Sequence, residues 1–274
     1  MKAIHFLAVV AVSGGLASIA QAAVDDVPTN PALTDRFFIG LGAYLPKSST
    51  TARLNPSSGG VGASFDFERA LGLEDQKGVP TVMGRIRLGE RWRIEAEYFE
   101  LNRRGTRTLD QQISWGDQTY PVGATVDSRL DFADTRVSAG YSFFKRQDKE
   151  VGIALGFHVA RYDANLSGSV QNATRAQGAA ITAPLPVLSV FGTFALTDQW
   201  SIGARLDRFS LSYDQYDGSI TSMAMDLLYQ PFRHLGFGLG YRSLFVELEA
   251  TKPSWNGRIE QSYQGPTVYV TGSF

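Results

Sequence analysis

Apolar and polar residues alternate with a period of two in segment after segment of this 274-residue chain. The alternation is clearest in residues 199–207, where one parity carries Trp200, Ile202, Ala204 and Leu206. A helix would mix the two parities, whereas a β-strand directs them to opposite faces. The chain is therefore predicted to be all-β, with strands that each have one apolar face.

The first 22 residues have the features of a secretory signal peptide. Lys2 precedes an apolar stretch over residues 4–12, and the small residues Ala20 and Ala22 occupy the positions that a signal peptidase requires. We expect cleavage after Ala22, which leaves residues 23–35 as a periplasmic N-terminal segment and residues 36–274 as a single folded domain.

Composition narrows the class of protein further. After the signal peptide no run of 18 apolar residues occurs, although 43% of the chain is hydrophobic, so no transmembrane helix is predicted. An exported chain of this kind is either periplasmic or an outer-membrane barrel, whose strands place apolar residues at alternate positions. Cysteine is absent, which excludes disulfides and Cys-ligated metals, and the net charge of -1 gives no indication of a nucleic-acid partner.

Ten segments have the alternation of a strand: 36–45, 80–89, 91–98, 126–144, 150–166, 185–197, 199–207, 219–232, 235–249 and 260–274. Short links (89–91, 145–149, 197–199, 231–235) alternate with longer ones (46–79, 104–125, 167–184, 214–218, 250–259). This alternation is typical of barrels with short periplasmic turns and long extracellular loops. We predict a transmembrane antiparallel up-and-down β-barrel of about 10 strands with both termini in the periplasm. Counts of eight or twelve stay open, because residues 61–67 could add a hairpin strand.

Two phase changes interrupt the pattern, at residues 98–99 and 206–209. They indicate either β-bulges or strands that extend beyond the lipid.

Aromatic residues cluster near both ends of the predicted strands, as the two interfaces of a membrane favour. Those beside the short turns are Trp92, Phe144, Trp200, Tyr229 and Phe232; those beside the long links are Tyr98, Tyr162, Tyr213, Tyr216 and Trp255.

The final residues resemble the C-terminal signal by which bacterial outer-membrane proteins are recognised for assembly, with Val268, Val270 and Phe274 at alternate positions and Gly272 departing from the usual bulky residue. Residues 66–68, 71–73, 85–87 and 91–95 are similar to a family of small, poorly characterised proteobacterial outer-membrane barrels. More distantly, the architecture resembles the outer membrane protein A and W groups. These resemblances imply anchoring, or passage of small hydrophobic molecules, in the bacterial outer membrane. They also imply outer-membrane lipid, lipopolysaccharide and the barrel assembly machinery as partners of a monomer.

Charged residues occupy the parity opposite the apolar one, so they must point into the lumen, since charges on the lipid face cost a few kcal/mol each. The predicted lumenal set is Arg85, Arg87, Arg93, Glu95, Glu97, Arg136, His158, Arg205, Asp207, Asp226 and Arg242. Six arginines against four carboxylates indicate either an ion-pair network that plugs a narrow barrel or the eyelet of a small, weakly anion-selective pore.

No catalytic constellation, metal-ligand spacing or cofactor motif is found, and we expect no enzyme. An outer-membrane hydrolase is the less favoured alternative: His234 falls in a periplasmic turn, and His158 is expected to join the lumenal network. Gly236, Gly238 and Gly240 are spaced by two within a strand and are expected to leave room for lumenal arginines. The carboxylates of the first long link (Asp66, Glu68, Glu74, Asp75, beside Arg69 and Lys77) are either a solvated loop or ligands for a divalent cation.

The sequence thus predicts a structural barrel or a narrow passage for small solutes or hydrophobic molecules. The alternative is a surface adhesin or receptor that acts through its extracellular loops.

Overall fold

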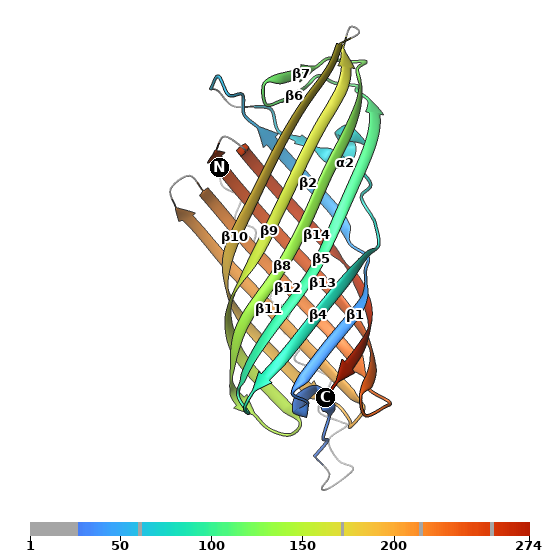
Figure 1. Cartoon of the computed structure of the whole chain (residues 1–274), viewed down its shortest axis with the longest axis vertical. Coiled ribbons are helices and arrows are strands. Elements are labelled where there is room, and N and C mark those ends of the chain that lie inside the picture. Colours follow the sequence, from blue (N-terminus) through green and yellow to red (C-terminus); the bar gives the residue numbers. More distant parts are fainter. Residues whose placement is uncertain (1–26, 60–61, 171–172, 214–215, 253–254) are drawn as a thin grey trace, which may run out of the picture.

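Ten antiparallel strands close on themselves in the computed structural model, which describes residues 27–59, 62–170, 173–213, 216–252 and 255–274. The order around the ring is β1-β4-β5-β8-β9-β10-β11-β12-β13-β14, and the pairing of β14 with β1 closes it. Figure 1 shows the strands inclined to the long axis, with α1 and the C-terminus at one end. The predicted all-β, ten-stranded antiparallel barrel is confirmed. Within the described residues, no helix has the length and hydropathy needed to cross a bilayer.

The strands of the ring are β1 (Phe37–Tyr44), β4 (Val79–Leu88), β5 (Trp92–Thr108), β8 (Thr125–Lys145), β9 (Lys149–Val170), β10 (Ala173–Ala195), β11 (Trp200–Tyr213), β12 (Tyr216–Tyr229), β13 (Leu235–Lys252) and β14 (Trp255–Ser273). The links contain α1 (Pro31–Thr34), β2 (Lys47–Leu54), β3 (Phe65–Asp66), α2 (Phe67–Leu71), β6 (Ile113–Trp115) and β7 (Gln118–Tyr120). The predicted signal peptide lies outside the described residues.

The first long link extends the sheet without adding a strand to the ring. β2 continues the line of β1 along β14, since Tyr44 is opposite Thr267 and Lys47 is opposite Gln264. β3 then pairs with β2 through residues 65–66. The predicted hairpin strand around residues 61–67 is therefore only this short bridge, and the ring has ten strands.

Three of the five segments predicted to be long loops are not loops. The described residues of 167–184, 214–218 and 250–259 belong to strands, because β9–β10, β11–β12 and β13–β14 are long hairpins. Their described outward side chains are small or polar, such as Ala180, Thr182, Asp217, Thr251 and Arg258, so the alternation of large apolar residues that identifies a lipid-facing strand is lost while the backbone pairing continues.

The inside and outside of the barrel exchange character along each long strand. On β9, Leu155 and Phe157 face outward and are exposed, and farther from the termini the same face carries Arg161 and Asp163. The inward face changes in the opposite sense, from polar Glu150 and His158 to apolar Ala160, Tyr162, Ala164 and Leu166. We call the half near the termini the proximal barrel and the other half the distal double sheet.

This exchange explains the phase changes in the sequence. The pairing of β11 with β12 is continuous from Trp200 to Tyr213, and that of β5 with β8 is continuous across Tyr98 and Phe99. The bulge interpretation is wrong at both places, and the strands extend beyond the apolar belt.

In the distal double sheet, the barrel flattens into two sheets packed face to face. β10 pairs with β11 only from Leu188 to Ala195; beyond this point β10 follows β9, and β11 follows β12. Rings from the two sides meet in the centre, where Phe132 of β8 stacks on Tyr263 of β14 at 4.6 Å between centroids. The resulting apolar core includes Leu101, Trp115, Tyr120, Leu130, Tyr162, Leu248 and Ile259, each at most 2% exposed.

Candidate functional site

The interior of the proximal barrel holds all eleven side chains of the predicted lumenal set. Among the described residues, every member except Arg85 lies within 4.0 Å of an oppositely charged group, counting His158 as a cation. Neighbouring strands bring them together because each strand contributes residues of its inward parity at the same depth.

Arg205 of β11 is the centre of one part of the network. Its Nη1 donates to Glu95 of β5 at 2.6 Å, and its Nε donates to Asp207 at 2.7 Å. The hydroxyls of Ser138 and Ser189 accept hydrogen bonds from its Nη2. The guanidinium group thus connects β11, β5, β8 and β10 across the lumen, with most of its donors used.

A second part connects β8, β5, β13 and β12. Arg136 donates to Glu97 at 2.9 Å, and Arg242 donates to the other oxygen of Glu97 at 3.1 Å. Arg242 also pairs with Asp226, whose carboxylate accepts the Tyr269 hydroxyl hydrogen bond at 2.8 Å.

Glu150 was not predicted as a member of the lumenal network, although it forms an ion pair with Arg87 and lies close to Arg93. Arg87 donates to both carboxylate oxygens at 2.8 and 2.6 Å, Nη1 of Arg93 lies 3.8 Å away, and the hydroxyl of Ser142 also donates to Glu150. Parity could have identified Glu150, because it shares the inward parity of His158 on the same strand.

Asp134 is the second missed member. Nδ1 of His158 donates to its Oδ2 at 2.9 Å, because an ionised carboxylate can only accept, and Nε2 of His158 lies 3.6 Å from Asp207. With Asp134 and Glu150 the carboxylates number six, as many as the arginines. The prediction that arginines outnumber carboxylates in the lumen, on which the anion-selective eyelet depended, is therefore wrong.

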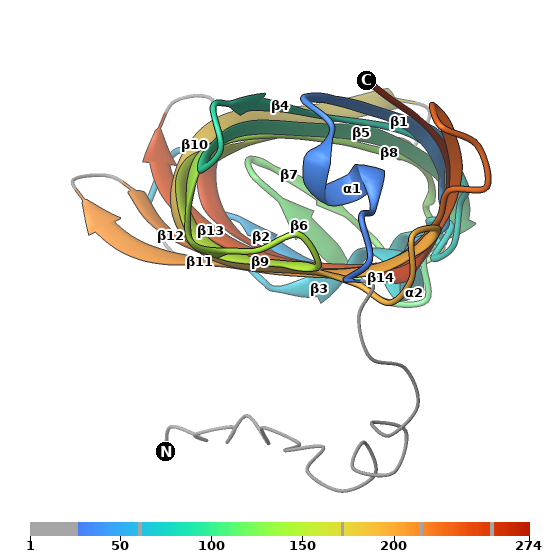
Figure 2. The ribbon, with the colours of Figure 1, turned by 90° about the horizontal axis from the view of Figure 1, so that it is seen from below.

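The described part of the N-terminal segment lies in the mouth of the proximal barrel (Figure 2). The carbonyl of Ala32 in α1 accepts hydrogen bonds from Arg85 at 2.6 Å and Arg87 at 3.1 Å. Asn30 caps α1 and donates to the turn after β10, while Asp35 pairs with Arg233. Arg85 thus donates to the backbone of α1 instead of to a carboxylate.

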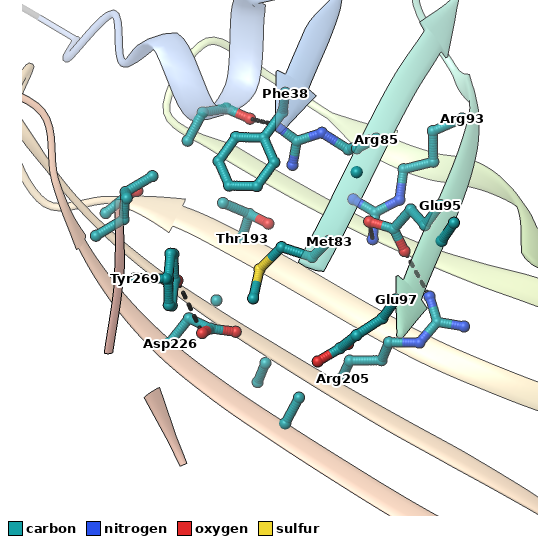
Figure 3. Close-up of a pocket in the computed structure, with 18 of the residues that line it drawn as sticks. Phe38, Met83, Arg85, Arg93, Glu95, Glu97, Thr193, Arg205, Asp226 and Tyr269 are labelled. Carbon is teal, nitrogen blue, oxygen red and sulfur yellow. Dashed lines mark hydrogen bonds and ion pairs between the residues drawn. The ribbon is translucent and has the colours of Figure 1, made fainter. Parts of the chain in front are cut away.

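A cavity of about 130 Å³ remains between α1 and the network. Figure 3 shows Tyr269 and Asp226 on one side of it, Glu95 and Arg205 on the other, and Phe38 and Met83 between them. The cavity has room for several water molecules and a mixed polar and apolar lining.

The glycines of β13 make room for more than arginine. A Cβ at Gly238 would lie 2.0 Å from Cζ of Tyr269, and one at Gly240 would lie 2.6 Å from Asp226 and 2.8 Å from Arg242. The expectation is right for Gly240. It is wrong for Gly238, which accommodates an aromatic ring, and for Gly236, where a Cβ would meet Gln230 and Thr271 and no arginine.

Aromatic side chains at the proximal rim are exposed on the outside. Trp92 lies against Tyr141, Trp200 stacks on Tyr229, and Phe144 and Phe232 project outward. Phe274 exchanges backbone hydrogen bonds with Phe37. In the predicted distal band, Tyr162 is misplaced, since it is fully buried in the apolar core.

Three of the four carboxylates of the first long link have protein partners. Asp66 caps α2 by accepting the Arg69 N–H, Glu68 pairs with buried Arg103 and accepts the Thr50 N–H, and Glu74 pairs with Lys77. Asp75 contributes its backbone carbonyl, which accepts from Ser48. Within the described ranges, no group of three or more His, Asp or Glu residues is arranged to hold a metal ion.

This fold, with apolar residues outside and ion pairs inside, is that of bacterial outer-membrane β-barrels. No family model matches the chain, and no curated protein matches it in sequence. Among solved structures, the outer membrane protease OmpT from Escherichia coli is similar, with 12% identity and a TM-score of 0.56 over 86% of this chain and 97% of that one.

Two other outer-membrane barrels match with lower TM-scores. The toluene transporter TodX of P. putida has 11% identity and a TM-score of 0.36, covering 90% of this chain and 92% of its own. The attachment invasion locus protein Ail of Yersinia pestis has 6% identity and a TM-score of 0.34, covering 86% and 98%.

Proposed function

We propose that the protein is a monomeric bacterial outer-membrane barrel that is closed along its axis and acts as a surface scaffold. In this proposal the distal double sheet is its extracellular part, lipopolysaccharide surrounds it, and the barrel assembly machinery recognises its last strand. The observation that carries the proposal is the apolar core of the distal double sheet, where Phe132, Tyr162 and Tyr263 fill the space between the walls.

The apolar belt supports the membrane location. Outward side chains of the proximal barrel include Ile39, Leu41, Ile86, Ile94, Val137, Phe157, Val190, Ile202, Leu239 and Val270, all exposed in the structure. Exposed apolar area of this extent is found where lipid covers the surface. The outward face of the distal double sheet carries residues such as Arg161, Asp163, Glu247 and Glu249, which water solvates.

The alternative roles have less support. A passage through the axis would need α1, the ion network and the apolar core all to move. The histidines give a hydrolase little support: His158 is 2% exposed and lies beneath the apolar core, and the exposed His234 lies in the β12–β13 turn at the proximal end, with its Nδ1 2.7 Å from the carbonyl oxygen of Ser273.

Conductance in planar bilayers tests the closed axis. We expect no steady conductance from the refolded protein without residues 1–22, from Arg85→Ala, or from a variant that also lacks residues 23–34, because the apolar core stays in place. Conductance of the unaltered protein would show a passage and contradict the proposal.

Cysteine labelling tests location and orientation, since the chain has no cysteine of its own. Asn165→Cys places a thiol on the exposed outer face of the distal double sheet, and Gln147→Cys places one in a proximal turn. In intact cells a membrane-impermeant maleimide should label Cys at 165 and not at 147. Equal labelling, or the reverse pattern, would contradict the orientation.

A further inference from the structure

A basic depression lies at the proximal mouth and adjoins the ion network at Arg87. Its volume is about 680 Å³, and its lining includes Arg36, Arg87, Glu90, Arg91, Lys145 and Arg146. Its cations come from three places that the ring sets side by side: the residue before β1, the β4–β5 turn and the β8–β9 turn. We call this depression the proximal basin.

Positive charge in the proximal basin is not balanced by the protein. Arg87 is neutralised by Glu150, whereas Glu90 is the single acidic residue of the lining. Across the described residues, none of Arg36, Arg91, Lys145 and Arg146 has an acidic partner within 4.0 Å; the nearby pair joins Lys149 to Asp148. Like charges gathered in a concave surface attract an anion strongly.

The position of the basin relative to the apolar belt indicates what kind of anion it fits. The guanidinium carbons of Arg36 and Arg146 lie 5.3 and 5.2 Å from the ring centroids of Phe37 and Phe144. Both rings face outward and are exposed, as are Leu88, Trp92 and Phe143 beside them. The basin therefore joins the edge of the surface that lipid chains would cover.

We propose that the proximal basin binds the phosphate of an anionic phospholipid headgroup in the periplasmic leaflet, with the acyl chains along Phe37, Leu88 and Trp92. The inference rests on the membrane location proposed above. Basic pockets at the membrane boundary recognise anionic headgroups in this manner. A zwitterionic phosphoethanolamine fits less well, because its ammonium group meets the same four cations.

Native mass spectrometry of the refolded protein tests the assignment, with phosphatidylglycerol and phosphatidylethanolamine of identical acyl chains as probes. The unaltered protein should retain phosphatidylglycerol preferentially. Each cation contributes about fivefold to the affinity for an anionic lipid. The variant Arg36→Gln/Arg91→Gln/Lys145→Gln/Arg146→Gln should therefore lose the preference.

A matched control removes four exposed cations elsewhere: Arg69→Gln/Arg104→Gln/Arg161→Gln/Arg208→Gln should keep the preference. Equal retention of the two lipids by the unaltered protein, or a preference that survives in the basin variant, would overturn the proposal. Should the fourfold basin variant not fold, the single variants Arg36→Gln and Arg146→Gln carry the same test, each with a weakening of about fivefold.

A competition experiment distinguishes a lipid ligand from a soluble anion. Inorganic phosphate at millimolar concentration should not displace phosphatidylglycerol, because it lacks the acyl chains that contact the belt. Displacement would assign the basin to soluble phosphate and overturn the lipid assignment. Failure of the membrane location would instead appear in the cysteine labelling, independently of which lipid is retained.

Discussion

Arg87 and Glu150 form a bidentate ion pair whose two N–O distances are 2.8 and 2.6 Å, and their side chains are 4% and 0% exposed. Removal of one partner from such a pair leaves a buried charge uncompensated, which costs about 3–5 kcal/mol. We expect Glu150→Ala to lower the free energy of unfolding by this amount in urea titrations of the refolded barrel. Glu90→Ala, in an exposed turn, should change it by less than about 0.5 kcal/mol. Similar values for the two variants would show that Glu150 does not hold the network together.

Gly238 lies beneath the ring of Tyr269, which is held by its hydrogen bond to Asp226. Because a Cβ at position 238 would lie 2.0 Å from Cζ of Tyr269, Gly238→Ala should destabilise the barrel by about 1–3 kcal/mol. Gly84→Ala is the control, since its Cβ would meet only ordinary contact at 3.7 Å. In a double-mutant cycle with Tyr269→Ala, the cost of Gly238→Ala should fall. Strictly additive effects would be evidence against the steric explanation.

Phe132 is the centre of the distal core, with Tyr162 and Tyr263 at 4.7 and 4.6 Å between ring centroids. We expect Phe132→Ala to cost about 3–5 kcal/mol of unfolding free energy. Limited proteolysis should then cut the distal hairpins before the proximal barrel. The outward Asn165→Ala serves as control and should leave both measurements nearly unchanged. A proteolysis pattern that does not change in Phe132→Ala would contradict a tightly packed distal core.

Asp117, in the β6–β7 turn, accepts hydrogen bonds from the hydroxyl and the backbone N–H of Ser57, both at 2.7 Å. These bonds hold the pKa of the Asp117 carboxyl below its ordinary value of 3.8. The contact is therefore fully formed above pH 3.8 and is lost as the pH falls through the lowered pKa. An NMR titration of the Asp117 carboxyl carbon should show this depression, and Ser57→Ala should bring the pKa closer to 3.8. A midpoint at the ordinary value in the unaltered protein would rule out the contact in solution.

The lumenal residues show how much of the interior can be predicted from the parity of residues along a strand. Arg205 and Glu95 were predicted to share the lumen because each has the parity opposite to apolar neighbours, but sequence gave no means of pairing them across 110 residues. Glu150 and Asp134 were missed although their parity is inward, because each lies at a turn or in a region where the neighbouring alternation changes. The proximal basin was missed altogether, since its cations come from the residue before β1 and from the β4–β5 and β8–β9 turns.

The alternation of residues by itself determined that the chain forms a closed antiparallel barrel, because lipid requires an apolar outer face and paired backbone groups. It also located the short turns and the interior charges of the proximal barrel. Only the tertiary structure decided that three of the five long links are paired hairpins and that the distal half has an apolar interior. The physical reason is that the distal strands face water on the outside and pack against each other on the inside. Polar residues there take the outward parity and apolar residues the inward one, so the pattern that identifies a lipid-facing strand ends while the strand continues. Whether a side chain such as Tyr162 faces lipid, water or a core depends on what lies opposite it, which the order of residues along one strand does not specify.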